Sequence, residues 1–263
     1  MILVIDVGNT NTEIGVFDGD DLLCSWRFVS KTPRTSDEYA VLIQGFFENE
    51  HLDYHEIESA IIASVVPNIM YSLKNGIKKL FNLEALEVGP GIKTGMPILT
   101  SDPAEVGADR IIDAVAAYNL YGGPVIVVDF GTASTYDYVD KNGAYLAKVT
   151  SPGIQISAEA LFRNAAQLPS IAIEKPDSIL GKDTVTSMQA GLVYGYIGQV
   201  EYIIARMIEE IGIKGIKVVA TGGYGRMFHE ETRAIDIYDP KLSLKGLKII
   251  HDKNIKGNRS GRC

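Results

Sequence analysis

Apolar and polar residues alternate along this chain in blocks of two kinds, short runs of strand length and longer stretches with helical spacing. The short runs predict strands at 2–7, 13–17, 22–29, 59–66, 86–88, 125–139 (a hairpin) and 216–220. The longer stretches predict helices at 36–50, 68–81, 103–121, 154–167 and 184–211. Strands and helices alternate through both halves of the chain, which predicts an α/β fold.

One helix start has strong local signals. Asp102 can cap a helix, Pro103 suits its first position, and Glu105 completes a capping box. We therefore expect one continuous helix over 103–121, ended by the pair Gly122-Gly123.

One pattern occurs twice in the sequence. An apolar run ends in Asp6-Val7-Gly8-Asn9-Thr10, and a second ends in Asp129-Phe130-Gly131-Thr132. The repeat predicts two similar domains, 1–118 and 119–254. Residues 255–263 are polar and lack periodicity, so we expect a disordered tail there.

The repeated hairpin has two interpretations. It can be an ordinary tight turn, because Asp, Gly and Asn all favour turns. A second copy at the matching place in the other half favours a nucleotide site, with Asp6 holding Mg²⁺ through water and Gly8 letting phosphates approach the backbone. Further polar groups for phosphate or a cation would come from Asn9, Thr10, Thr12, Asp129 and Thr132.

Composition narrows the class of protein. The net charge of -8 and pI near 5.1 argue against a nucleic-acid-binding surface, which needs clustered Lys and Arg. Cys24 and Cys263 are the only cysteines, so no disulfide framework is predicted. No signal peptide or membrane-spanning run is visible, and we expect a soluble, cytoplasmic protein.

Asp109 lies in a second candidate motif, Gly107-Ala108-Asp109-Arg110, inside the predicted helix 103–121. Helical geometry puts Asp109 at the edge of the apolar stripe, where it can be a plain surface carboxylate. Gly107 favours a functional role, because a glycine within a helical turn costs about 1 kcal/mol relative to alanine. Such a residue is easier to explain if something approaches the backbone there.

Three other features stay open. The pair Gly222-Gly223 is typical of a turn under an adenine base, but also of an ordinary strand-to-helix turn. The helix glycines can serve core packing or a subunit interface; they are Gly191, Gly195 and Gly198. The histidines stand in polar surroundings and are expected at the surface; they are His51, His55, His229 and His251.

Together these motifs resemble the type III pantothenate kinases, members of the acetate kinase, sugar kinase and actin superfamily. The resemblance covers Met1 to about Asn254 and rests on Asp6-Val7-Gly8-Asn9-Thr10, Gly107-Ala108-Asp109-Arg110, Asp129-Phe130-Gly131-Thr132-Ala133, Pro152-Gly153-Ile154, Gly181-Lys182-x-Thr184 and Thr221-Gly222-Gly223. It implies duplicated ribonuclease H-like (actin-like ATPase) domains, each a mixed sheet flanked by helices, with a cleft between them. It also implies ATP-dependent phosphorylation of pantothenate to 4′-phosphopantothenate, the first step of coenzyme A biosynthesis.

The resemblance assigns roles to individual residues. ATP would be bound by Asp6, Val7, Gly8, Asn9, Thr10, Asn11, Thr12, Glu13 and Thr132. Pantothenate would contact Gly107, Ala108, Asp109, Arg110 and Thr184, with Asp109 as the catalytic base. Thr184 would come from the neighbouring subunit of a homodimer, and Asp129 would hold a monovalent cation, K⁺ or NH₄⁺.

The chain departs from the family at Lys148, where glycine is common and a lysine could crowd the backbone near the substrate. Two other functions stay open, and the lysine bears on the second of them. The protein could be another small-molecule kinase of the superfamily, acting on a sugar or acetate. It could instead be a non-catalytic accessory or regulatory member of the family that serves in transcription.

Overall fold

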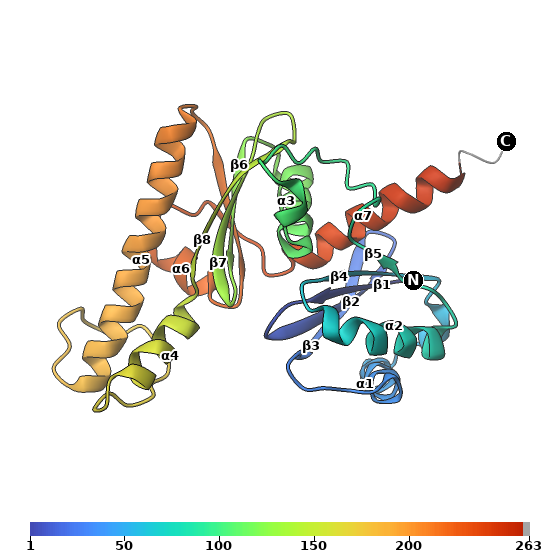
Figure 1. The fold of residues 1–263 in the computed structure, drawn as a ribbon, viewed down its shortest axis with the longest axis horizontal. Coiled ribbons are helices and arrows are strands. Elements are labelled where there is room, and N and C mark those ends of the chain that lie inside the picture. Colours follow the sequence, from blue (N-terminus) through green and yellow to red (C-terminus); the bar gives the residue numbers. More distant parts are fainter. Residues whose placement is uncertain (260–263) are drawn as a thin grey trace. The chain divides into compact units, whose positions relative to one another are not determined.

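The computed structural model describes residues 1–259, which fold as two compact units (Figure 1). The first unit contains 1–96, 101–119 and 241–259, and the second contains 97–100 and 120–240. The chain changes unit after Asn119, close to the boundary expected after 118. The expected domain 119–254 is not continuous, however, because its last part returns to the first unit.

The first unit is built on a five-stranded mixed sheet with the order β3-β2-β1-β4-β5. Its strands are β1 (Ile2–Val7), β2 (Asn11–Asp18), β3 (Asp21–Val29), β4 (Ser59–Ser64) and β5 (Leu86–Glu87). The first three strands are antiparallel neighbours, whereas β4 runs parallel to β1 and β5 parallel to β4. Consequently β1 and β4 end at the same edge of the sheet.

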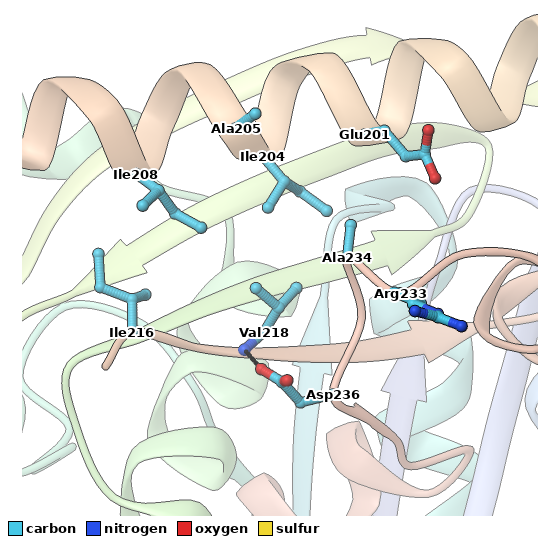
Figure 2. Close-up of a pocket in the computed structure, with 9 residues that line it drawn as sticks. All are labelled: Glu201, Ile204, Ala205, Ile208, Ile216, Val218, Arg233, Ala234 and Asp236. Carbon is cyan, nitrogen blue, oxygen red and sulfur yellow. Dashed lines mark hydrogen bonds between the residues drawn. The ribbon is translucent and has the colours of Figure 1, made fainter. Parts of the chain in front are cut away.

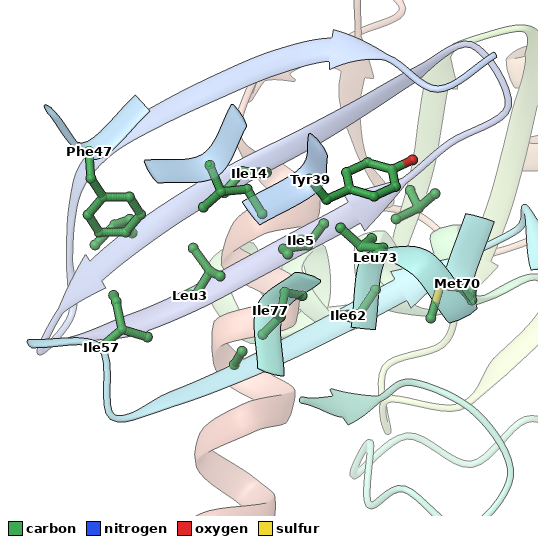
Figure 3. Packing of buried hydrophobic residues seen from close by; sticks show 14 residues of the cluster. Leu3, Ile5, Ile14, Tyr39, Phe47, Ile57, Ile62, Met70, Leu73 and Ile77 are labelled. Atoms are coloured by element: carbon green, nitrogen blue, oxygen red, sulfur yellow. The ribbon is translucent and has the colours of Figure 1, made fainter. Parts of the chain in front are cut away.

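Alternation along β1 separates the two faces of this sheet. Leu3 and Ile5 point into a core with residues of α1 (Ser36–Asn49) and α2 (Pro67–Phe81), as Figure 3 shows. Each such fully buried aliphatic side chain stabilises the fold by roughly 1.5–3 kcal/mol. The opposite face, which carries Val4, packs against α7 (Leu242–Arg259). This apolar contact brings the end of the chain back to the first unit.

The second unit has a matching mixed sheet with the order β10-β9-β6-β7-β8. Its strands are β6 (Val125–Phe130), β7 (Ala133–Val139), β8 (Tyr145–Pro152), β9 (Lys217–Gly222) and β10 (Ile237–Tyr238). Its helices are α4 (Ile154–Asn164), α5 (Thr184–Ile211) and α6 (Gly225–Glu231). Helices α5 and α6 cover the face that carries Ile126 and Val128. The strands and helices of this unit thus repeat the build of the first.

The helix expected over 103–121 is wrong in its first part. Pro103–Glu105 form a separate 3-10 helix capped by Asp102, and α3 (Ala108–Tyr121) begins only after an extended residue, Val106. The side chain of Val106 is buried. Bending the chain to bury this residue breaks the continuous helix that the capping pattern predicts.

The other corrections fall in the second half of the chain. Sequence periodicity did not predict β8, α6, β10 or α7. The backbone of 255–259 belongs to α7, where we expected part of a disordered tail, and 260–263 lie outside the described residues. His251 is also buried, not at the surface, because it lies on the face of α7 that packs on the first sheet.

Through residue 259, no helix is long and apolar enough to cross a membrane.

Candidate active site

The first repeated motif forms a tight turn at the end of β1. Asp6 is the fifth residue of that strand, and the turn closes where Gly8 N donates to the carbonyl of Asn11 over 3.1 Å. A Cβ atom at position 8 would lie 3.0 Å from that carbonyl oxygen, which explains the glycine. Asn9, Thr10 and Asn11 are exposed. The turn therefore presents short polar side chains beside an aspartate.

Two of the predicted ATP-binding residues, Thr12 and Glu13, lie on β2 directly after this turn and stabilise it through polar contacts. Thr12 is fully buried and shares a 2.8 Å hydrogen bond with the hydroxyl of Ser30. Glu13 lies directly opposite Asp6 in the strand pairing, and it forms ion pairs with Arg27 and Lys241. These cations balance the charge of a second carboxylate close to Asp6.

Asp109 lies in the first turn of α3, where its Oδ1 accepts a 2.8 Å hydrogen bond from Arg110 N. This carboxylate folds back over Gly107, where a Cβ atom would overlap Oδ1. The group that approaches the glycine is thus the carboxylate of Asp109 itself. A helix start favours negative charge, because its free N–H groups form the positive end of the helix dipole.

Contacts of Val65, the residue after β4, place Asp109 near the first turn. The side chain of Val65 lies 3.6 Å from the Cβ position of Gly107, and Val65 N donates to the carbonyl of Val7 over 3.1 Å. The motif 107–110 therefore lies at the sheet edge where β1 ends. The structure brings the predicted base and the predicted phosphate turn together within one unit.

Asp129, in the second motif, is surrounded by hydroxyl groups. It lies directly opposite Thr135 on β7 and Thr221 on β9, so that the three side chains share one face of the sheet. Both threonines are buried. Asp6 by contrast has Glu13 as its cross-strand neighbour. The two aspartates look alike in sequence but differ in chemical surroundings.

Three glycines allow the second turn to pack closely, because a side chain at each position would meet a neighbouring group. A Cβ at Gly222 would overlap Asp129 Oδ1, and one at Gly131 would lie 3.1 Å from Oδ2. At Gly153 a Cβ would overlap the carbonyl oxygen of Thr132, to which Gly153 N donates over 3.1 Å. Thr132 itself is exposed. These contacts explain why the glycines of the Thr221-Gly222 and Pro152-Gly153 motifs accompany Asp129.

Thr184 is the first residue of α5 and is exposed, next to the capping residue Asp183. Asp183 accepts a 2.9 Å hydrogen bond from Thr186 N and so fixes the helix start. Tyr196 of α5, which contacts the second turn, lies twelve residues further along, a rise of about 18 Å. Within one protomer, Thr184 is therefore not part of the cluster around Asp129.

Comparison with known proteins decides the family. The family model for type III pantothenate kinase matches residues 2–206. A type III pantothenate kinase from Agathobacter rectalis is 58% identical over 261 residues, which covers 99% of each chain. One from Geobacillus sp. (strain WCH70) is 50% identical over 255 residues, 97% of this chain and 98% of the relative. The chain belongs to the type III pantothenate kinases.

The fold comparison agrees with the expected actin-like architecture. The crystal structure of MreB 5 of Spiroplasma citri bound to AMPPNP superposes with a TM-score of 0.57 and 11% identity. The match covers 99% of this chain and 98% of that one. At this identity the likeness shows the fold alone. The prediction of an actin-like ATPase fold is confirmed.

Lys148, at which this chain departs from the family pattern, is an exposed residue of β8. It lies opposite Asp137 in regular pairing with β7. The close backbone contacts of the second turn involve Gly153, which follows the last residue of β8. The lysine therefore does not crowd those contacts.

A pocket of about 240 Å³ in the second unit contains none of the predicted residues. It lies between α5 and β9, as Figure 2 shows, and apolar side chains such as Ile204 and Ile208 form one wall. Asp236 accepts a 2.8 Å hydrogen bond from Val218 N there, and Glu201 accepts one from Thr232. These two carboxylates therefore support the loop between α6 and β10.

Sequence reasoning missed the residues that support the site. Arg27 and Lys241 hold Glu13, and Tyr196 contacts the second turn, yet none belongs to a recognised motif. A sequence signal exists only for Arg27, which strand pairing would place opposite Glu13. Lys241 and Tyr196 reach the site through tertiary packing.

Proposed function

We propose that the protein transfers the γ-phosphoryl group of ATP to the primary hydroxyl of pantothenate and so produces 4′-phosphopantothenate and ADP. The observation that carries this proposal is the position of Asp109, held over Gly107 next to the turn that follows β1. Family membership supplies the substrate pair. The arrangement in the first unit supplies a carboxylate beside a phosphate-binding turn.

In this mechanism Asp109 orients the pantothenate hydroxyl and accepts its proton. The hydroxyl oxygen bonds to the γ-phosphorus, and the bond from that phosphorus to the oxygen of the ADP leaving group breaks. Phosphoryl transfer has a loose transition state, so positioning and charge neutralisation contribute more than base strength. The hydrogen bond from Arg110 N limits the motion of the Asp109 carboxylate.

The first turn fits Mg²⁺-ATP. Mg²⁺ keeps several waters and commonly takes only one or two carboxylates from a protein, which suits a site supplied by Asp6 alone. In residues 1–259 no group of three His, Cys, Asp or Glu side chains is placed to bind a metal ion. When bound, Mg²⁺ neutralises phosphate charge. The exposed Asn9, Thr10 and Asn11 would donate to phosphate oxygens.

The second turn suits a monovalent cation. Potassium favours neutral oxygen ligands such as carbonyl groups, and here one carboxylate is flanked by two threonines. The exposed Thr132 would contact ATP from the same turn. We therefore assign K⁺ or NH₄⁺ to Asp129 and Mg²⁺ to Asp6.

A homodimer would complete the pantothenate site. The family resemblance assigns Thr184 to the pantothenate site of a neighbouring subunit, and its exposed position at the start of α5 leaves it accessible for that role. The glycines of α5 also support a dimer, because Gly191, Gly195 and Gly198 are exposed and the space around their Cβ positions is open. Their spacing places them on one face of the helix.

An assay of ADP formation tests this function. We expect activity with pantothenate, K⁺ and Mg²⁺, and a strong reduction when K⁺ is replaced by Na⁺. Glucose, N-acetylglucosamine and acetate should not serve as acceptors. Activity with one of these acceptors alone would indicate a different kinase of the superfamily, and ATP consumption with none would favour the accessory role.

The variant Asp109→Asn tests the proposed base. We expect kcat to fall by about 10²- to 10⁴-fold, because general-base catalysis and positioning of the hydroxyl are both lost. The dissociation constant for ATP, measured by calorimetry, should stay within about twofold. The control is Asp21→Asn, which neutralises an exposed carboxylate at the start of β3. Unchanged turnover in Asp109→Asn would disprove the assignment.

A further inference from the structure

The hydroxyl of Tyr196 joins α5 to both sides of the second turn. It hydrogen-bonds to the hydroxyl of Ser134 on β7 and donates to the carbonyl of Pro152 on β8 over 3.0 Å. Tyr196 is buried, with 5% of its surface exposed. We propose that Tyr196 is a positioning residue that holds the Asp129–Thr132 turn in the geometry required for ATP and the monovalent cation.

The two partners of Tyr196 lie where the turn is most closely packed. Ser134 follows Thr132 by two residues, and Pro152 pairs with Ala133 in the β7–β8 ladder. The residue after Pro152 is Gly153, which donates its N–H to the carbonyl of Thr132. A shift of either partner would therefore be transmitted to Thr132 through one or two residues.

The hydroxyl can act separately from the ring. The Tyr196 ring stacks on Phe228 with centroids 5.0 Å apart, and phenylalanine would keep this contact. Burial raises the pKa of Tyr196, so the phenol stays protonated and able to donate. Because its proton goes to the carbonyl of Pro152, the hydroxyl of Ser134 donates to the phenol oxygen. Each hydroxyl thus has a defined role in a chain of two hydrogen bonds.

Tyr196 contacts the second turn from the face of the sheet that α5 covers. Asp129 lies on the face of the sheet opposite to the one that α5 covers. The helix therefore supports the turn from the other face and does not contact the proposed ligands. Tyr196 therefore acts through Thr132 and Asp129 and takes no part in the chemistry. The inference rests on the proposed function for the identity of those ligands.

Replacement of Tyr196 by Phe tests the proposal. We expect the KM for ATP and the half-saturating K⁺ concentration to rise by about three- to tenfold, the effect of losing one or two buried hydrogen bonds. The KM for pantothenate should stay within about twofold, since residues 107–110 belong to the other unit. A purely structural role would not separate the two substrates in this way.

Three further variants sharpen the test. Ser134→Ala should raise the KM for ATP in the same direction, and Tyr196→Phe with Ser134→Ala should show a combined effect smaller than the product of the single effects. Tyr194→Phe removes a phenol hydroxyl from the same helix that donates to the carbonyl of Pro176, outside the second turn, and it should leave the KM for ATP unchanged. Circular dichroism and thermal unfolding check that each variant is folded.

The outcomes separate this inference from the proposed function. Unchanged ATP and K⁺ dependence in a folded Tyr196→Phe variant would overturn the positioning role, as would equal changes in both substrate constants. If the wild-type protein does not phosphorylate pantothenate, the proposed function fails. Calorimetric titration of ATP would then still test Tyr196, since weaker ATP binding in the variant alone would support its role.

Discussion

Both carboxylate oxygens of Asp129 lie against glycine residues, and this packing explains more of the local sequence than turn formation does. Gly222 has a φ of +89°, and its missing side chain leaves room for Asp129 Oδ1. Gly223 has nothing within 4 Å of its Cβ position. The sequence suggested a shared role for this pair. The structure shows that only the first glycine is required by a contact.

The pair offers a matched test at the residue scale. Gly222→Ala should lower the free energy of unfolding by about 1–3 kcal/mol, through unfavourable φ and overlap with Asp129 and the backbone of Phe130. It should also raise the half-saturating K⁺ concentration, because Asp129 must move. Gly223→Ala should leave both quantities close to wild type. Denaturant unfolding and K⁺ titration of activity measure the two effects, and equal behaviour of the variants would contradict this explanation.

At the scale of elements, α7 is attached to the first sheet by a partly buried polar network as well as by apolar contacts. His251 Nε2 shares a 2.8 Å hydrogen bond with the hydroxyl of Ser59, and Nδ1 lies 3.3 Å from Asp252. Lys248 forms ion pairs with Asp252 and Asp20. Such a network is stable only when each member keeps its partner. The attachment of α7 should therefore depend on pH.

Burial holds the pKa of His251 below its ordinary value of 6.5, against an opposing effect of Asp252. The unfolded chain, with the ordinary pKa, binds a proton at higher pH than the folded protein does. The contribution to stability is therefore complete above pH 6.5 and is lost as the pH falls from there towards the lowered pKa. Below the lowered pKa, both states are protonated and the loss is complete.

We expect the free energy of unfolding to decrease over this range in the wild type, and to decrease less in His251→Gln. Urea unfolding at a series of pH values from 7.5 downward measures it. His55→Gln changes an exposed histidine and keeps His251, so it should retain the wild-type profile. The same pH dependence in all three proteins would show that His251 is not responsible.

At the scale of the whole molecule, α5 presents an exposed face of small residues with one aromatic side chain. Gly191, Gly195 and Gly198 share a face with Tyr202, which is 69% exposed. Glycine weakens a helix by about 1 kcal/mol relative to alanine, so three exposed glycines would be unfavourable in a monomer. Close approach of a second helix in the proposed homodimer would explain them.

Gly195→Glu should therefore convert a dimer to a monomer, because a charged side chain would enter the contact. Glutamate is a better helix former than glycine, so the fold itself should not suffer. Sedimentation equilibrium measures the association, and activity should fall together with dimer content if Thr184 comes from the partner. Gly45→Glu makes the same change in α1, where the Cβ position is also open, and should remain dimeric. A dimeric Gly195→Glu variant would place the interface elsewhere.

Local patterns in the sequence were sufficient for the features that depend on neighbouring residues. Periodicity predicted β1 and the limits of α5, and the repeated motif predicted both aspartate turns. A separate motif, Gly107-Ala108-Asp109-Arg110, and its resemblance to the family made Asp109 the candidate base, since residue type and order along the chain carry that information. These features follow from side-chain alternation and turn preference, which act over a few residues.

Only the tertiary structure decided the features that depend on distant residues. The helix expected from 103 is interrupted because Val106 is buried, and His251 is buried because α7 returns to the first sheet. The partners of Glu13 and the contacts of Tyr196 likewise join residues far apart in the chain. Burial and long-range hydrogen bonds depend on how distant segments pack, so local periodicity does not predict them.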